Sequence, residues 1–394
     1  MSAPVLLAYR PLGLGDLLTA VPALRGLRAA FPEHRLVLAV PAPLAPLAEL
    51  IDAVDGVLPT APLAVPDADR ADVAVNLHGR GPQSHRALLA ARPRRLLAFA
   101  SDAAGWPPPM ADTAAATASA TPATPATPAT PATPATPATT EPLAAAAISR
   151  WRAREHEVQR WCRLLAESGI PADPAQLDLP APPGTPPAMA AGATVVHPGA
   201  ASAARRWPAE RWAAVAAAER AAGRAVVVTG SPDERALAEA VAQAAGLPAT
   251  AVLAGRTELL ELAALVAGAG RVLCGDTGVG HLATAFGVPS VVLFGPTPPA
   301  EWGPPRGRPR HVALHRGGRG DPHGDTPDPG LLAITVEDVL AATREPFGGV
   351  IRSGRPPTWD SQTRSVVASS RPSATSPTTP TPAARASSRS ARAT

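Results

Sequence analysis

Short apolar runs alternate with helix-like stretches over most of the chain. In the first half, the runs Val5–Tyr9, Leu36–Val40 and Ala71–Leu77 predict buried strands. Residues 17–31 and 83–91 predict helices. Because strands that alternate with helices form a parallel sheet covered by helices, this pattern predicts a Rossmann-like α/β half.

The same alternation returns in the second half of the chain. Further strands are expected at Thr194–Val196, Ala225–Thr229, Ala251–Leu253, Val272–Cys274 and Ser290–Phe294. Helices are expected from Pro208, from Pro232, and at Glu258–Ala267, Val279–Phe286 and Thr335–Thr343. The chain is long enough for two domains with a core each, so we expect two Rossmann-like domains.

Proline-rich stretches interrupt the pattern. Thr121–Ala138 consists of six copies of Thr-Pro-Ala, which forbids helix and strand pairing and favours an extended spacer. We therefore predict a disordered insertion at 101–143, after which Trp151–Ser168 returns to helix. The predicted organisation is a first domain at 1–170, a linker at 171–192, a second domain at 193–346 and a disordered basic tail at 347–394.

Charge is concentrated in that tail. Between Val350 and Thr394 there are seven arginines and one acid, Asp360, so this segment carries +6 and leaves −2 of the total +4 for the rest. A nearly neutral body gives no support to nucleic-acid binding. The start of the sequence has no charged signal-peptide segment, and no run of about 18 apolar residues occurs, so we expect a cytoplasmic protein.

Metal and disulfide chemistry receive no support either. The two cysteines, Cys162 and Cys274, define neither a disulfide framework nor a metal cluster. Asp67 and Asp69 form an Asp-x-Asp pair, but the pair precedes a predicted strand and does not end one. The chain has no lysine, and this excludes a P-loop nucleotide-binding motif.

The first loop with candidate chemistry follows the strand Val5–Tyr9 and contains Gly13, Gly15 and Asp16. As a dinucleotide fingerprint it is incomplete, because Leu18 stands where the third glycine would be. Asp16 would lie at a helix start. It either caps that helix, which is worth about 0.5–2 kcal/mol, or serves in chemistry.

Two loops of the second half carry groups suited to a nucleotide. His197-Pro-Gly199-Ala ends one strand, and Arg205-Arg-Trp-Pro208 precedes the next helix. Glycine lets a backbone approach an anion and arginine can grip a phosphate, although a solvated loop with a surface tryptophan is the alternative. After the next strand, Asp233 and Glu234 either begin a helix or bind the hydroxyls of a ribose.

The most informative stretch is Val272–Pro296, a strand–turn–helix–strand unit with Asp276, Thr277 and Gly278 at the helix start. Unpaired N–H groups and the partial positive charge of a helix N-terminus suit a phosphate. His281, one turn into the helix, either hydrogen-bonds a phosphate or sugar or is structural.

Several of these segments together resemble one known family. The stretches GDTGVGHLATAFGVPSVVLFGPTPPAEWGP, GLGDLLTAVPALRGLR, HPGA and RRWP are similar to segments of the heptosyltransferase family, glycosyltransferase family 9. The resemblance covers about residues 4–100 and 145–345. It implies a GT-B fold, in which two Rossmann-like domains face each other across a cleft.

The resemblance also implies roles for individual residues. Asp16 would be the general base, and Gly13, Gly15 and Arg80 would lie on the acceptor side. The donor site would contain His197, Gly199, Arg205, Glu234 (or, second to it, Asp233), Asp276, Thr277, Gly278 and His281. Arg205 stands where the family typically has lysine; it keeps the charge and adds a bidentate grip.

The implied reaction is an inverting sugar transfer without a metal or other cofactor. The donor would be a nucleotide-diphosphate sugar, with ADP-heptose as one candidate, and the acceptor a cell-envelope glycan or glycolipid. Peripheral contact with the inner membrane face is a further expectation, and nucleic acid is not an expected partner. The alternatives are a non-catalytic nucleotide-sugar-binding relative, a nicotinamide-dependent oxidoreductase, which the incomplete glycine fingerprint argues against, and nucleic-acid binding through the tail.

Overall fold

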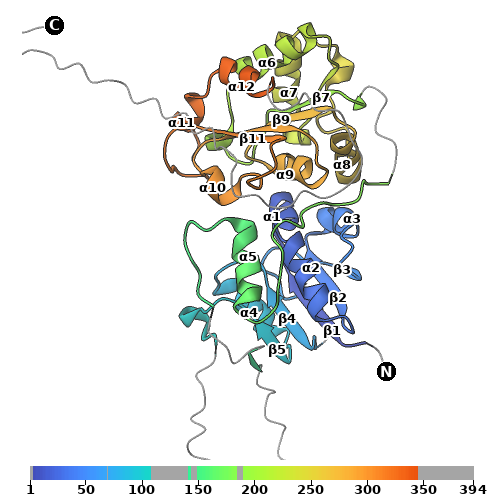
Figure 1. Ribbon diagram of the computed structural model, residues 1–394, viewed down its shortest axis with the longest axis vertical. Coiled ribbons are helices and arrows are strands. Elements are labelled where there is room, and N and C mark those ends of the chain that lie inside the picture. Colours follow the sequence, from blue (N-terminus) through green and yellow to red (C-terminus); the bar gives the residue numbers. More distant parts are fainter. Residues whose placement is uncertain (1–2, 69, 108–140, 143–148, 184–189, 345–394) are drawn as a thin grey trace, which may run out of the picture.

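The computed structural model describes residues 3–68, 70–107, 141–142, 149–183 and 190–344. Two parallel sheets, each flanked by helices, lie one beyond the other along the long axis of the molecule (Figure 1). The predicted α/β architecture with two Rossmann-like halves is confirmed. The tail at 347–394 and most of the predicted insertion lie outside the described residues, and the exact domain boundaries stay predictions.

The first sheet is parallel throughout the described residues. Its spatial order is β3-β2-β1-β4-β5-β6. The strands are β1 (Val5–Tyr9), β2 (Arg35–Val40), β3 (Gly56–Pro59), β4 (Val73–Asn76), β5 (Arg95–Leu97) and β6 (Glu141–Pro142). The central strands are almost wholly buried, as expected for a sheet covered on both faces. The three predicted strands are confirmed, whereas the short strands β3, β5 and β6 were missed.

The predicted helix at 17–31 is two helices, α1 (Leu14–Thr19) and α2 (Val21–Ala30). Pro22 lies in the first turn of α2, where its missing N–H costs nothing; inside one continuous helix it would break a hydrogen bond. The chain therefore breaks at Ala20. Because α1 begins at Leu14, Asp16 occupies its third position.

The remaining helices of the first half are α3 (Ala45–Ala48), α4 (Gln83–Ala90) and α5 (Glu157–Ala166). α5 is shorter than the predicted 151–168. Both ends of the predicted insertion have regular structure: residues 101 and 106 pair across a 3-10 turn, Trp106 is buried, and β6 joins the sheet. These short segments carry too little pattern to be read from the sequence.

The second sheet has the order β11-β10-β9-β7-β8, again all parallel among the described residues. Its strands are β7 (Thr194–His197), β8 (Val226–Val228), β9 (Arg271–Gly275), β10 (Ser290–Phe294) and β11 (His311–His315). The expected strand at Ala251–Leu253 is a single bridge from Val252 to Val228. The helices are α6 (Ala209–Ala221), α7 (Arg235–Ala244), α8 (Leu259–Ala267), α9 (Gly278–Ala285), α10 (Pro299–Trp302), α11 (Pro329–Leu332) and α12 (Val336–Ala342).

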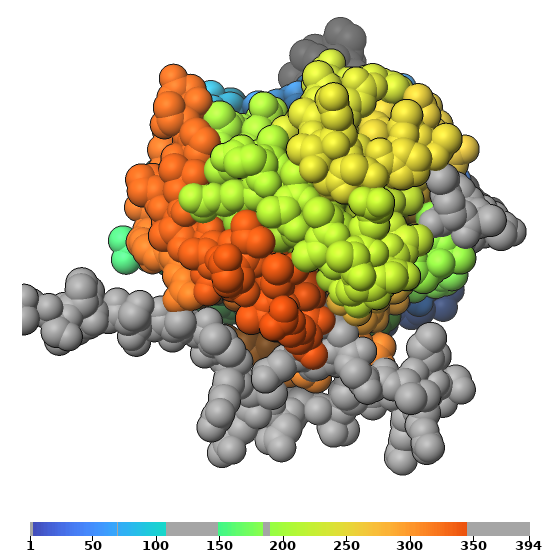
Figure 2. All heavy atoms as spheres, turned by 90° about the horizontal axis from the view of Figure 1, so that it is seen from above, coloured from blue at the N-terminus to red at the C-terminus, as the bar shows by residue number. Residues whose placement is uncertain are grey.

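The two halves pack tightly against each other. One cluster of buried apolar residues extends from the first sheet into β9 and α9 of the second half. Helices α1 and α9 meet at the junction, and α3 contacts α8 nearby (Figure 1). Viewed from above, the second half covers most of the first (Figure 2). None of the described helices is long and apolar enough to cross a membrane.

Arginines from both halves contact residues 176–178 of the predicted linker. Arg25 of α2 donates hydrogen bonds to the carbonyl oxygens of Gln176 and Asp178, at 2.7 and 2.8 Å. Arg308, which follows α10, forms an ion pair with Asp178 at 2.6 Å. Residues 176–178 are therefore bound to arginines of both halves.

Candidate functional site

The site forms where the N-terminal ends of α1 and α9 meet. A Cβ atom on Gly15 would lie 2.9 Å from Cδ2 of His281, and one on Gly278 would lie 2.8 Å from the side chain of Leu14. Real Cβ atoms do not approach other atoms so closely, so a side chain at either position would require its neighbour to shift. The structure thus brings the first-half loop of Gly15 against the helix start of Gly278 and His281.

Asp16 lies at this junction with its side chain 26% exposed. The N–H of Gly13 donates to Oδ2 of Asp16 at 3.2 Å, so the carboxylate does cap α1. Oδ1 lies 3.2 Å from Nη2 of Arg10. Burial raises the pKa of Asp16, while Arg10 lowers it and the charge of Glu157 raises it. A carboxylate whose pKa is raised is a stronger base once it has ionised.

Carboxylate and imidazole groups gather at the ends of β7 and β8. Nδ1 of His197 shares a hydrogen bond with Thr229 Oγ1 at 3.0 Å, and its Nε2 lies 4.0 Å from the Glu234 carboxylate. A Cβ on Gly199 would overlap that carboxylate. Burial lowers the pKa of His197, so the imidazole is neutral near pH 7. Of the two predicted acids, Glu234 and not the exposed Asp233 joins this group.

Arg205 and Asp276 lie together in front of α9. Nη1 of Arg205 donates to the backbone carbonyl of Asp276 at 3.3 Å. Burial raises the pKa of Asp276 to about 6, against the lowering effect of Arg205. Thr277 is the N-cap residue of α9, and its buried Oγ1 has no hydrogen-bond partner among the described residues. This helix start combines unpaired donors with a nearby cation and suits an anionic group.

Comparisons with known proteins agree with this arrangement. The sequence model of glycosyltransferase family 9 (heptosyltransferase) matches residues 143–322. Lipooligosaccharide heptosyltransferase 2 of Haemophilus influenzae is 36% identical over 107 residues, which is 26% of this chain and 30% of the relative. Lipopolysaccharide heptosyltransferase 1 of Pseudomonas aeruginosa is 43% identical over 98 residues, 24% of this chain and 26% of the relative. Residues 143–322 of the chain therefore match glycosyltransferase family 9.

Sequence matches to these curated family members span less than a third of the members' own length. Solved structures extend the likeness to the whole fold. E. coli ADP-heptose LPS heptosyltransferase II superposes with a TM-score of 0.62 at 18% identity, covering 86% of this chain and 97% of that one. E. coli heptosyltransferase WaaC with ADP-2-deoxy-2-fluoro heptose superposes with a TM-score of 0.59 at 18% identity, covering 86% of this chain and 99% of that one. These structures confirm the expected GT-B fold.

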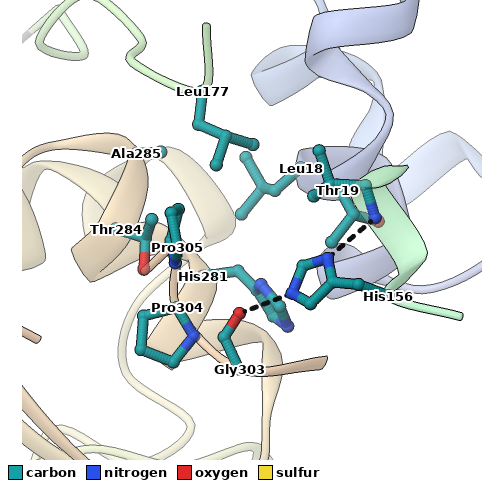
Figure 3. Close-up of a pocket in the computed structure, with 11 residues that line it drawn as sticks. Leu18, Thr19, His156, Leu177, His281, Thr284, Ala285, Gly303, Pro304 and Pro305 are labelled. Atoms are coloured by element: carbon teal, nitrogen blue, oxygen red, sulfur yellow. Dashed lines mark hydrogen bonds between the residues drawn. The ribbon is translucent and has the colours of Figure 1, made fainter. Parts of the chain in front are cut away.

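A small pocket lies between the halves, beside the meeting point of α1 and α9. Figure 3 shows His156 at its edge, with Nε2 donating to the carbonyl oxygen of Gly303 at 3.0 Å. The His281 ring packs edge-on against Trp302, with the ring centroids 6.0 Å apart. Burial lowers the pKa of His281 to about 4, so this ring is neutral and enclosed. The pocket lining includes neither Asp16 nor Asp276.

One alternative from the sequence can now be judged. The solvated-loop alternative for the 205–208 segment is wrong for Trp207, which is 2% exposed and donates from Nε1 to the Ile334 carbonyl at 3.1 Å. Arg80 lies exposed between β4 and α4, and the structure shows no hydrogen bond from it to another described residue. Its expected acceptor role stays a prediction. Among the described residues, no cluster of three or more His, Cys, Asp or Glu could hold a metal ion.

Sequence analysis missed two charged residues of the site, Arg10 and Glu157. The Arg10 side chain is fully buried and lies 2.9 Å from Glu157 of α5. For Arg10 a signal exists, because arginine directly after a buried strand is almost never buried unless it is paired. For Glu157 no sequence signal exists, since it lies 147 residues further along the chain.

Proposed function

We propose that this protein is an inverting, metal-independent glycosyltransferase. It would move a sugar from a nucleotide-diphosphate donor, with ADP-heptose the first candidate, to a hydroxyl of a cell-envelope glycan or glycolipid. The observation that carries the proposal is the close approach of Gly15 to His281, because it places Asp16 next to the anion-binding start of α9. The match of residues 143–322 to family 9 and the ADP-heptose named for E. coli heptosyltransferase II support the donor class.

Each half would have its own task in the reaction. The Asp16 carboxylate would take the proton of the acceptor hydroxyl as its oxygen attacks the anomeric carbon. The bond from that carbon to the diphosphate oxygen breaks, and the diphosphate leaves with its charge stabilised by the N–H groups of α9 and by Arg205. Because attack and departure occur on opposite faces in one displacement, the anomeric configuration inverts.

The second half would hold the rest of the donor. The Glu234 carboxylate, which accepts a hydrogen bond from the Ser231 N–H at 2.8 Å, would accept hydrogen bonds from ribose hydroxyls. The glycine at position 199 leaves room for this carboxylate beside the strand end. We further propose that the enzyme acts at the cytoplasmic face of the cell envelope.

Donor choice is tested first by thermal unfolding with ADP-, GDP-, UDP- and dTDP-sugars. A donor that binds the folded protein at 100 times its Kd stabilises it by about 2.7 kcal/mol. We expect the largest shift with ADP-heptose. No shift with any nucleotide sugar would contradict the proposal.

The reaction itself is tested with ADP-heptose and a lipopolysaccharide core acceptor that lacks its heptoses. We expect ADP release, a product with inverted anomeric configuration by NMR, and the same rate with and without EDTA. A retained configuration would contradict the inverting part of the proposal. Loss of activity in EDTA would contradict the metal-independent part. Binding of the donor without transfer would favour the non-catalytic alternative.

A further inference from the structure

A cluster of buried charges lies behind Asp16 in the first half. It consists of Arg10, Glu157 and Arg160, which we call the Arg10 cluster. The side chains of Arg10, Glu157 and Arg160 are 0, 5 and 7% exposed. Burying paired charges rarely adds stability over apolar packing. A role at the site is therefore a better explanation for the cluster than a role in the core.

The Arg10 guanidinium contacts both the backbone and the side chain of Asp16. Its Nε donates to the Asp16 carbonyl at 3.0 Å, and its Nη2 lies 3.2 Å from Oδ1. Its Nη1 donates to the carbonyl oxygen of Leu77 at the end of β4. The planar Arg10 guanidinium thus links Asp16, the third residue of α1, to the sheet below it. A lysine could not reproduce this geometry.

Glu157, at the start of α5, holds the guanidinium from the other side. Its Oε1 lies 2.9 Å from Nη2 of Arg10 and accepts a hydrogen bond from Trp161 Nε1 at 2.8 Å. Its Oε2 pairs with Arg160. The Trp161 ring lies under the Arg10 guanidinium, 4.8 Å from it. Each carboxylate oxygen of Glu157 is therefore held by a residue other than Arg10.

We propose that Arg10 and Glu157 are positioning residues for the Asp16 carboxylate, with Glu157 fixing the guanidinium and the guanidinium fixing Oδ1. This inference rests on the proposed function, in which Asp16 is the general base. With Oδ1 held by Arg10 and Oδ2 by the Gly13 N–H, the carboxylate keeps one orientation toward the junction with α9. A base held in place loses less free energy in reaching the reactive geometry.

The charges around Asp16 give this inference a specific signature. Arg10 lowers the pKa of Asp16 and Glu157 raises it. Arg160 faces Glu157 from α5, while His281 on α9 and His78 after β4 are neutral because burial lowers the pKa of each to about 4. Burial lowers the pKa of His156 as well. Removing the charge of Arg10 should therefore raise the pKa of Asp16, and removing that of Glu157 should lower it.

The test is the pH profile of kcat/KM with ADP-heptose and the truncated core acceptor, for the wild type, Arg10→Met and Glu157→Gln. A base must be ionised, so the acid limb should move to higher pH in Arg10→Met and to lower pH in Glu157→Gln, by about 0.5–1 pH unit each. We also expect kcat to fall about 10-fold or more in both, with the donor KM within about twofold. Glu157→Gln keeps the shape of the side chain. If Arg10→Met does not fold, the pH profile of Glu157→Gln alone tests the proposal.

Glu219→Gln is the matched control. Glu219 is also a buried carboxylate, 1% exposed, but it pairs with Arg224 at 2.7 Å in the second half. This variant should lose stability and leave the acid limb in place. Unshifted acid limbs and wild-type kcat in the two cluster variants would overturn the positioning role.

Asp16→Asn in the same assay distinguishes the base assignment of Asp16 from the positioning role of Arg10 and Glu157. If it is inactive while both cluster variants behave as wild type, positioning is wrong and the base assignment stands. If Asp16→Asn transfers sugar at the wild-type rate, the base assignment fails and the positioning role fails with it.

Discussion

Gly15→Ala adds one methyl group at the contact between the two halves. The new Cβ would lie 2.9 Å from Cδ2 and 3.3 Å from Nε2 of His281, whose ring is held in turn against Trp302. Overpacking of this kind costs about 1–3 kcal/mol. Alanine in place of a helical glycine stabilises the folded chain by about 1 kcal/mol, but only relative to the unfolded chain.

Two measurements therefore respond differently to this one methyl group. The free energy of unfolding should fall by at most about 2 kcal/mol, because the clash and the helix preference partly cancel. The free energy of bringing the two halves together should include the whole steric cost. The helix preference of alanine does not offset it, since α1 is helical whether the halves are apart or together. We expect kcat/KM to fall by about 5- to 150-fold.

The control is Gly79→Ala, where the added Cβ meets nothing within 4 Å. A double variant, Gly15→Ala with His281→Ala, should show strong coupling because the second change removes the clash. If Gly15→Ala retains the wild-type kcat/KM, the meeting of α1 and α9 is not the reactive arrangement and the reasoning fails.

Three further changes test separate parts of the site. Gly199→Ala should displace the Glu234 carboxylate and weaken binding of ADP about 10- to 150-fold, measured by calorimetry, because this corresponds to the loss of a hydrogen bond to a charged group. Gly318→Ala, with open space around the new Cβ, should leave ADP binding unchanged. Asp276 has a pKa raised to about 6, so its protonated form is favoured in the folded state and stability should decline as pH rises from about 4 to 6. Asp276→Asn should remove this decline from the pH dependence of Tm; an unchanged decline would exclude Asp276 as its source. Trp207→Phe should lose the bond to Ile334 and about 1–3 kcal/mol of unfolding free energy, with ADP affinity unchanged; a weaker ADP affinity would show that Trp207 shapes the donor site.

The sequence predicted the long buried strands well and the short ones poorly. β1, β2 and β10 contain apolar runs of four or five residues, and such runs leave few alternatives to a buried strand. β5 has three residues and β6 two, so neither contains a period that could be recognised. The break between α1 and α2 was missed although Pro22 marked it, because a proline near a helix start is compatible with either one helix or two.

The residues assigned to the donor side could be grouped from the sequence because each lies at the end of a strand or in the loop that follows it. His197, Glu234 and Asp276 lie at the same edge of a parallel sheet, where carboxyl ends of strands converge. The Arg10–Glu157 pair depends on a contact across 147 residues, including the stretch of Thr-Pro-Ala repeats. Only the folded chain brings α5 under the loop of Asp16.

The central claim is that Asp16 of one half acts on a donor bound by the other. Single-turnover transfer by Asp16→Asn, measured beside its affinity for ADP, tests this claim directly. We predict wild-type ADP affinity, because the donor groups lie in the second half, and a chemical step slowed by about 10²- to 10⁴-fold. Transfer at the wild-type rate would contradict the account.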